Sequence, residues 1–119
     1  VAFTRSDNGN IGAPVVFFLP SSPDEEVAYT LYMGGDIAET VIETGRPWLP
    51  DVILFGDSFT NALETVLYTA FDTTVCLDFR HNKSKTIYDY IDEYKPDFVI
   101  CLRDDTATLS PDGNGNLPG

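Results

Sequence analysis

Basic side chains are scarce in this 119-residue sequence, which has 7 Lys and Arg residues against 19 Asp and Glu residues and a net charge of −12. Nucleic acids and anionic membranes attract proteins through clustered Lys and Arg side chains. No such cluster occurs here, so the sequence predicts neither as a partner. The composition, 43% hydrophobic and 13% aromatic, is nevertheless that of a folded protein, and the length suits one domain.

Long apolar runs are also absent. The longest, such as residues 15–19, are far shorter than the roughly 20 residues that a helix needs to cross a bilayer, so we expect no membrane insertion by this chain. No signal peptide is recognisable. The sequence begins at Val1 and not at Met, so we expect that targeting information has been cut away.

Residues that bind metals are few. His81 is the single histidine, and the two cysteines, Cys76 and Cys101, show neither metal-ligand spacing nor a disulfide framework. No glycine motif for phosphate or dinucleotide binding is present either. The sequence therefore predicts no metal and no cofactor. Both cysteines fall inside apolar, strand-like segments, which predicts buried free thiols.

The most informative stretch is residues 50–61, in which an apolar run over residues 52–55 leads into a Gly-Asp-Ser corner. An unbroken apolar run is typical of a parallel strand covered on both faces. Ser58 is then expected where the carboxyl end of a strand meets the amino end of a helix, the edge at which open α/β sheets bind ligands. The simpler interpretation is that Asp57 or Ser58 caps the helix.

Helical spacing after this corner predicts one apolar and one polar helix face. The predicted apolar face consists of Phe59, Leu63, Val66, Leu67 and Ala70, and the other side of Thr60, Asn61, Glu64, Thr65 and Tyr68.

Further along the chain, a strand at 74–77, a helix at 84–94 and a strand at 97–102 complete a β-α-β-α-β pattern within residues 47–105. This order predicts an α/β fold with a mainly parallel sheet and right-handed crossovers.

The two ends of the sequence are less regular. Residues 1–46 are predicted to be β-rich, with strands at 15–19, 27–33 and 38–43 and a turn or frayed end at 7–10. Residues 106–119 show no core pattern, and we expect a loose tail there.

Polar residues follow each predicted parallel strand, and the carboxyl ends of parallel strands share one edge of a sheet. We therefore expect a common rim that carries Asp57 and Ser58, then Asp78, Arg80 and His81, then Arg103, Asp104 and Asp105. Arg80 and Asp78 are expected to form an ion pair that organises this rim. Because solvated loop ends are also polar, this convergence alone does not define a site.

Several of these motifs occur in an order that resembles a known group. They are Tyr-Thr-Leu-Tyr-Met-Gly-Gly-Asp at 29–36, Phe-Gly-Asp-Ser-Phe at 55–59, Asp-Phe-Arg at 78–80 and Tyr-Lys-Pro-Asp-Phe-Val-Ile at 94–100. Over about residues 27–105 the sequence resembles the SGNH/GDSL hydrolase superfamily. Within it, the likeness is strongest to the C-terminal half of the DHHW proteins and the related alginate O-acetyltransferase-like proteins of the cell envelope.

The resemblance implies a three-layer α/β/α, flavodoxin-like fold and a serine nucleophile for acyl-ester chemistry on carbohydrate, in the cell envelope or outside the cell. Ser58 would be the nucleophile and would also supply its N–H to the oxyanion, and Asp57 would shape the corner. Gly34 and Gly35 lie where such proteins supply another donor. Asp104 lies where the family commonly has an Asn that donates to the oxyanion.

Two features depart from the family. An ionised Asp104 cannot donate a hydrogen bond to an oxyanion. The family also activates its serine with a His–Asp pair upstream of the serine strand, and residues 1–50 contain no histidine. His81 follows a predicted strand that ends at the same rim, from which it could reach Ser58 as a substitute base. It also follows Arg80 in a stretch where the family has no catalytic base, so we favour placing both residues at the rim as structural or substrate-binding groups.

Two interpretations stay open. In the first, residues 1–119 are a single SGNH-type esterase or O-acetyltransferase domain or the C-terminal portion of one, which is inactive alone because it needs an Asp-His pair from a missing N-terminal segment. In the second, they form a degenerate, non-catalytic module that binds carbohydrate or another partner. A phosphatase-like use of Asp57 lacks its accompanying residues, since Phe59 and Asn61 stand where Asp and Thr are needed. A receiver-like use lacks an early acidic pair and a Lys after a strand.

Overall fold

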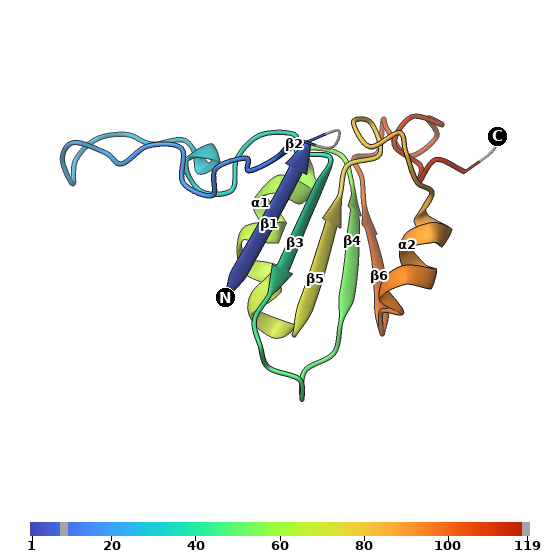
Figure 1. Ribbon diagram of the computed structural model, residues 1–119. Helices are drawn as coiled ribbons and strands as arrows, with labels where there is room; N and C mark the ends of the chain where they lie inside the picture. Colours follow the sequence, from blue (N-terminus) through green and yellow to red (C-terminus); the bar gives the residue numbers. More distant parts are fainter. Residues whose placement is uncertain (8–9, 118–119) are drawn as a thin grey trace.

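A mixed six-stranded sheet forms the centre of the protein, with strand order β2-β1-β3-β5-β4-β6 (Figure 1). The computed structural model describes residues 1–7 and 10–117, so the turn expected around Asn8 and Gly9 lies outside the described residues. The strands are β1 (Ala2–Asp7), β2 (Asn10–Ile11), β3 (Glu39–Glu43), β4 (Val52–Gly56), β5 (Thr73–Leu77) and β6 (Phe98–Leu102). The helices are α1 (Phe59–Leu67) and α2 (Ile87–Tyr94), with short 3-10 turns η1 (Tyr29–Leu31) and η2 (Tyr68–Ala70).

Strand direction divides the sheet into two halves. β4 pairs in parallel with both β5 and β6, as the β-α-β-α-β pattern predicts. β3 pairs antiparallel with β5, and β1 pairs antiparallel with β3 and β2. The prediction of a mainly parallel sheet is therefore wrong for the whole molecule, because apolar patterning marks a strand without fixing its direction. The protein is an α/β domain with a mixed sheet.

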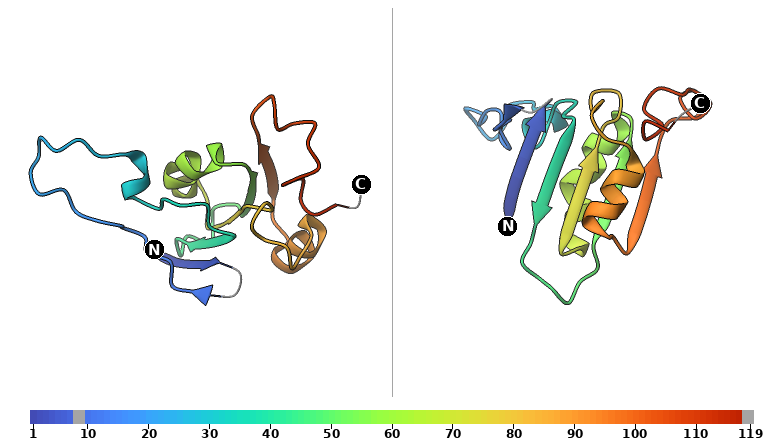
Figure 2. Two further views of the ribbon diagram at one scale, coloured as in Figure 1. Left: turned by 90° about the horizontal axis from the view of Figure 1, so that it is seen from above. Right: turned by 45° about the vertical axis from the view of Figure 1, so that its right-hand side comes forward.

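One helix lies on each side of this sheet (Figure 2). On the α2 side, Ile53, Val75 and Leu77 pack against Ile87 and Tyr90 in the main apolar core. α2 begins with a capping box between Thr86 and Asp89 and ends at Lys95, which adopts a left-handed conformation before Pro96. The capping box explains why the helix begins at Ile87, later than the predicted residue 84, while its end at Tyr94 agrees with the prediction.

The helix α1 buries the opposite face from the one that its sequence predicts. Thr60, Asn61 and Glu64 are buried against the sheet, whereas Phe59 and Val66 are each 60% exposed. The reason lies in the sheet surface below, where polar residues face the helix. A helical wheel reports amphipathicity but cannot report that the sheet face below the helix carries buried polar groups such as Arg5 and Thr40.

Arg5 of β1 is the largest of these polar groups, with a side chain that is fully buried. Its guanidinium donates to the carbonyl oxygens of Met33 at 3.0 Å and Gly34 at 3.1 Å, and its Nε donates to Thr40 Oγ1 at 3.3 Å. Glu64 Oε1 lies 3.9 Å from Arg5 Nη2, which is an ion pair without a short hydrogen bond. Arg5 therefore links β1, the Gly-Gly turn and α1.

Burial raises the pKa of the Glu64 carboxyl to about 7, although the Cys76 thiol and the Arg5 charge act against this rise. The folded protein thus binds this proton more tightly than the unfolded chain does, where the pKa is about 4.3. The associated stability is present below the unfolded pKa and is lost as the pH rises through about 7.

We expect Glu64→Gln to remove this pH dependence. Between about pH 5 and pH 8, the free energy of unfolding of the parent protein should fall by up to about 3 kcal/mol more than that of the variant. Urea titrations of both proteins at each pH measure the two free energies of unfolding. Repulsion among the other acidic side chains affects both proteins alike, so it cancels in the difference between them. Parallel pH profiles of the two proteins would contradict the assignment.

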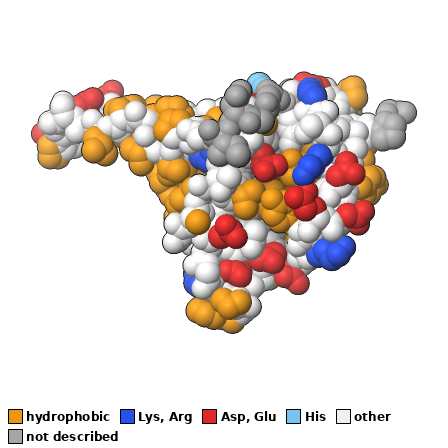
Figure 3. Space-filling model, in the orientation of Figure 1, with side chains coloured by type: hydrophobic (Ala, Val, Ile, Leu, Met, Phe, Trp, Pro, Cys, Tyr) orange, Lys and Arg blue, Asp and Glu red, His pale blue; other side chains and the backbone are white. Residues whose placement is uncertain are grey.

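Residues 13–32 form an arm that extends away from the sheet (Figure 1). The strands predicted at 15–19 and 27–33 are wrong: one isolated bridge joins Val16 to Tyr32, and the 3-10 turn η1 occupies part of the second segment. Apolar side chains gather along this arm, while acidic side chains spread over the body (Figure 3). The third predicted strand, at 38–43, corresponds to β3, and the strand β1 was missed because its sequence is polar.

Residues 106–117 also differ from the loose tail that their composition predicts. The Asn116 side chain donates to the carbonyl oxygens of Asn82 and Lys85, and Gly115 accepts a hydrogen bond from the N–H of Ile87. Cys76 is buried as predicted, but Cys101 is exposed because β6 is a bare edge strand. Among the described residues, no helix is long and apolar enough to cross a membrane.

Candidate functional site

The site begins at the corner between β4 and α1. Gly56 ends the strand, and a Cβ atom at this position would lie 1.7 Å from the carbonyl oxygen of Leu102, so only glycine fits. Asp57 is buried: its Oδ1 accepts from the N–H of Phe59 at 2.9 Å and its Oδ2 accepts from the N–H of Asp104 at 2.7 Å. Asp57 therefore fixes the start of α1 and ties the end of β6 to this corner.

Ser58 lies at the amino end of α1, on the edge of the sheet where the parallel strands β4, β5 and β6 end. Its side chain makes no capping hydrogen bond and is exposed. Asp57, and not Ser58, supplies the side-chain contact to the first turn. The hydroxyl of Ser58 is thus left free beside the positive end of a helix.

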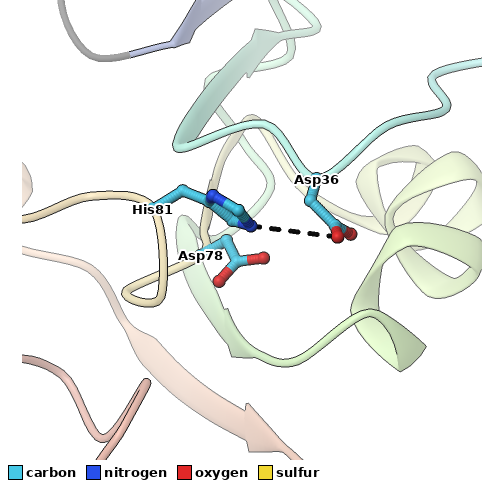
Figure 4. A group of neighbouring side chains, drawn as sticks. All are labelled: Asp36, Asp78 and His81. Atoms are coloured by element: carbon cyan, nitrogen blue, oxygen red, sulfur yellow. Dashed lines mark ion pairs between the residues drawn. The ribbon is translucent and has the colours of Figure 1, made fainter.

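A second group of side chains stands on the same rim, contributed by the loops before β3 and after β5 (Figure 4). His81 Nε2 lies 3.8 Å from Asp36 Oδ2, and Arg80 Nη2 lies 3.4 Å from Asp36 Oδ1. The Arg80 guanidinium also binds Asp78 through two contacts, as the sequence predicts. Asn61 joins this group to α1, because its side-chain amide donates to Asp36 Oδ1 at 2.8 Å.

Electrostatics connect the two groups. The hydrogen bond with Asp78 raises the pKa of Arg80 above its ordinary value, and the charges of Asp36 and Asp57 add to this effect. Ligand atoms of Asp36, Asp78 and His81 lie within 4.8 Å of one another, a spacing that a metal ion can bridge. Arg80 Nη2 contacts both carboxylates, so its single positive charge offsets part of the negative charge of this group.

The Gly-Gly turn that precedes Asp36 is held rigidly. Gly34 is buried, and a Cβ there would lie 2.1 Å from the carbonyl oxygen of Thr30. Gly35 is exposed with a φ of 91°, a conformation that favours glycine. The carbonyl oxygens of Met33 and Gly34 accept hydrogen bonds from Arg5, which anchors the turn that leads into Asp36.

Asp104 reaches the rim through its backbone. Its N–H binds Asp57, while its carboxylate accepts from the Thr106 hydroxyl at 2.8 Å and from the N–H of Ala107. These contacts, the Thr106 hydroxyl first, lower the pKa of Asp104. The carboxylate is therefore ionised and committed to its own loop.

The predicted rim residues thus follow β4, β5 and β6 at one edge of the sheet, where the Arg103 side chain turns toward the C-terminal segment. Its guanidinium binds the carbonyl oxygens of Ser110 and Asp112 in the C-terminal segment. Two rim residues were missed by sequence reasoning, Asp36 and Asn61. Asp36 directly follows the Gly-Gly pair, which is the available signal, whereas helical spacing puts Asn61 on the side of its helix opposite the predicted apolar face.

One hollow in the surface does not include Ser58. It has a volume of about 470 Å³ on the α2 side and is lined by Ser6, Ala38, Glu39, Asn82, Lys83, Ser84 and Tyr90. A smaller hollow of about 290 Å³ is lined by Phe55, Cys101, Arg103, Thr108 and Asn114. Ser58 lines neither of these hollows, and its side chain is exposed at the rim.

These features define the class of the protein: an α/β domain with a mixed sheet and, at a strand-to-helix corner, a serine whose side chain makes no capping hydrogen bond. It shares the fold of PatB1 from Bacillus cereus, solved with a sulfonyl adduct, at a TM-score of 0.68 and 27% sequence identity. It also shares the fold of a DHHW family protein from Eubacterium siraeum, at a TM-score of 0.71 and 20% identity.

The matches cover nearly all of this chain but a smaller part of the solved structures. They include 88% of this chain and 36% of the PatB1 chain, and 95% of this chain and 39% of the DHHW protein. The chain thus spans less than half the length of these proteins. No protein-family model matches the sequence, and no match was found among the curated proteins.

Proposed function

We propose that this chain is an SGNH-type serine esterase or O-acetyltransferase domain that acts on acyl esters of cell-envelope carbohydrate, with Ser58 as the nucleophile. The observation that carries the proposal is the Ser58 hydroxyl, exposed and free of capping contacts at the amino end of α1. The adduct named for PatB1 supports it, because sulfonyl groups attach covalently to reactive nucleophiles such as serine hydroxyls. The proposal includes the three-layer arrangement of that superfamily.

In the proposed reaction, Ser58 Oγ attacks the carbonyl carbon of the ester and its proton passes to a base. The tetrahedral oxyanion is stabilised by the N–H of Ser58 and the positive end of α1. Cleavage of the bond to the leaving alcohol gives an acyl-serine, and water or an acceptor hydroxyl then takes the acyl group. Asp57 contributes by holding the corner in shape.

The base is the incomplete part of this site. His81 is the single histidine, and its Nε2 faces Asp36 within a group that Arg80 organises. We assign Arg80 and His81 to substrate binding, and we propose that an Asp-His pair comes from polypeptide beyond these 119 residues. The substrate and this segment are the proposed partners, and the cell envelope or its exterior is the proposed location.

Serine and histidine substitutions test this assignment in the protein expressed from its complete reading frame. With an aryl acetate as substrate, Ser58→Ala should lower kcat/KM by about 1,000-fold or more. His81→Ala should change kcat by less than about tenfold, because the residue contacts substrate without accepting the proton. Full activity of Ser58→Ala would remove Ser58 as the nucleophile.

A non-catalytic, carbohydrate-binding module is the second candidate, favoured by one specific observation. The ionised carboxylate of Asp104 stands where the resembling family commonly has a donating Asn. Exposed aromatic side chains such as Trp48, which is 75% exposed, offer surfaces for sugar rings. Binding of an acetylated polysaccharide that Ser58→Ala leaves unchanged, together with absence of turnover in the parent, would favour this candidate.

A further inference from the structure

Large apolar side chains stand uncovered on one face of the sheet, the face that α1 occupies. Phe59 and Val66 of α1 are each 60% exposed, and Phe98 and Leu102 of β6 are 54% and 36% exposed. Phe98 and Leu102 alternate along β6, so they share a face. The Phe98 ring also contacts Phe71, which follows η2 at the end of the α1 segment. We refer to these four exposed residues as the α1–β6 surface.

The charge pattern makes this surface unusual. The protein carries a net charge of −12, yet Glu64 is the single charged residue in α1 and is buried, and β6 contains no charged residue. Acidic proteins ordinarily place charges on solvated helix faces. A charge-free apolar surface in such a protein is typical of an interface.

β6 adds an unsatisfied backbone edge to this surface. It is the last strand in the sheet order and pairs with β4 alone among the described residues. Every residue of β6 except Ile100 is exposed. Natural edge strands are protected by charges, proline or bulges, and β6 has neither a charge nor a proline. A strand of this kind is suited to receive another strand.

Two observations indicate what covers it. A second copy would bring another charge of −12 to the contact, which opposes self-association. The solved structures that share this fold are longer, and the matches reach only 36% and 39% of their chains. We propose that further polypeptide of the same protein covers the α1–β6 surface, adding a strand to β6 and packing against Phe59 and Val66.

Such a cover reaches the rim of the sheet. Phe59 directly follows Ser58, and the Leu102 carbonyl accepts from the N–H of Asp57 at 3.4 Å. Polypeptide on this surface therefore borders the corner that carries Ser58. The inference rests on exposure and strand pairing, so it stands or falls separately from the role of Ser58 as a nucleophile.

Two matched lysine substitutions test the surface in the protein expressed from its complete reading frame. Val66 and Tyr88 are both large, exposed helical residues, at 60% and 64%, but Tyr88 lies on α2, away from the proposed interface. Val66→Lys should lower Tm by about 4 °C or more, whereas Tyr88→Lys should change it by less than about 1 °C. Equal effects of the two substitutions would overturn the proposal.

Amide hydrogen exchange of β6 gives a second, independent measurement on the unmutated protein. In a bare edge strand, alternate amides point away from β4 and exchange rapidly. We expect all β6 amides to exchange at least about tenfold more slowly than such free amides, at a sedimentation coefficient that shows a monomer. Rapid exchange of alternate amides would overturn the proposal, and so would slow exchange that is lost when a dimer is diluted, which would assign the surface to a second copy.

Discussion

Replacing Arg5 with methionine is expected to lower the free energy of unfolding by about 3–5 kcal/mol at about pH 8. The side chain is fully buried and donates to Thr40, Met33 and Gly34 from a single guanidinium. Methionine fills a similar volume but leaves these acceptors without a donor and leaves Glu64 without its counter-charge. Urea unfolding at equilibrium measures the loss.

The double variant Arg5→Met/Glu64→Leu distinguishes a buried ion pair from simple packing. Because replacing both partners removes the uncompensated carboxylate, the double variant should be more stable than Arg5→Met alone by about 1 kcal/mol or more. Lys85→Met is a suitable control, since its pair with Glu93 is solvent-accessible and contributes about 0.5 kcal/mol. A double variant no more stable than Arg5→Met would show that Glu64 is not coupled to Arg5.

Gly56→Ala is expected to have a comparably large effect, about 3 kcal/mol or more. The added Cβ would lie 1.7 Å from the carbonyl oxygen of Leu102 and 2.9 Å from Thr60 Cγ2. The first atom belongs to the backbone of β6, so relief requires that β4 and β6 separate or that the corner before Ser58 shifts. Thermal and urea unfolding should both report the loss, and the Ser58 corner should lose its shape with it.

Gly45→Ala is the matched control for this prediction. Gly45 has a φ of 70°, and no atom would lie within 4 Å of an added Cβ. Gly45→Ala should lower the free energy of unfolding by about 1–2 kcal/mol, because alanine is strained in the left-handed conformation. Equal losses for the two variants would mean that the close approach between Gly56 and Leu102 does not exist in solution.

The parallel half of the fold could be predicted because its signals are local and agree with one another. An unbroken apolar run at β4, the Gly-Asp-Ser corner and the segments that became β5, α2 and β6 each carry a pattern that belongs to one type of element. Their order then fixes the parallel pairing with β4 at the centre. The position of Ser58 at the carboxyl edge follows from this order alone.

In the antiparallel half, β3 could be predicted, but β1 and the antiparallel pairing could not, because they depend on tertiary contacts. β1 is a strand with few apolar residues, and it is held by pairing with β3 and by the buried Arg5. Arg5 explains why α1 turns Glu64 inward, and Asp36 explains why it turns Asn61 inward, against the amphipathic pattern. Long-range charge pairing leaves no periodic signature in a sequence.

The rim was predicted in part for the same reason. Arg80 and Asp78 lie two residues apart, so their pair is visible in the sequence, and the structure contains it. The contacts of Asp36 with Asn61 and His81 join residues far apart in the chain, along the edge where the parallel strands end. Only the folded arrangement shows that they stand on the rim that carries Ser58.

Covalent labelling with an aryl sulfonyl fluoride, followed by peptide mass spectrometry, tests the proposed nucleophile most directly. In the protein expressed from its complete reading frame, we expect one sulfonyl group on the peptide that contains Ser58, and none after Ser58→Ala. Sulfonylation of another residue, with the Ser58 peptide unmodified and the Ser58→Ala variant labelled as fully as the parent, would contradict the assignment of Ser58 as the reactive hydroxyl.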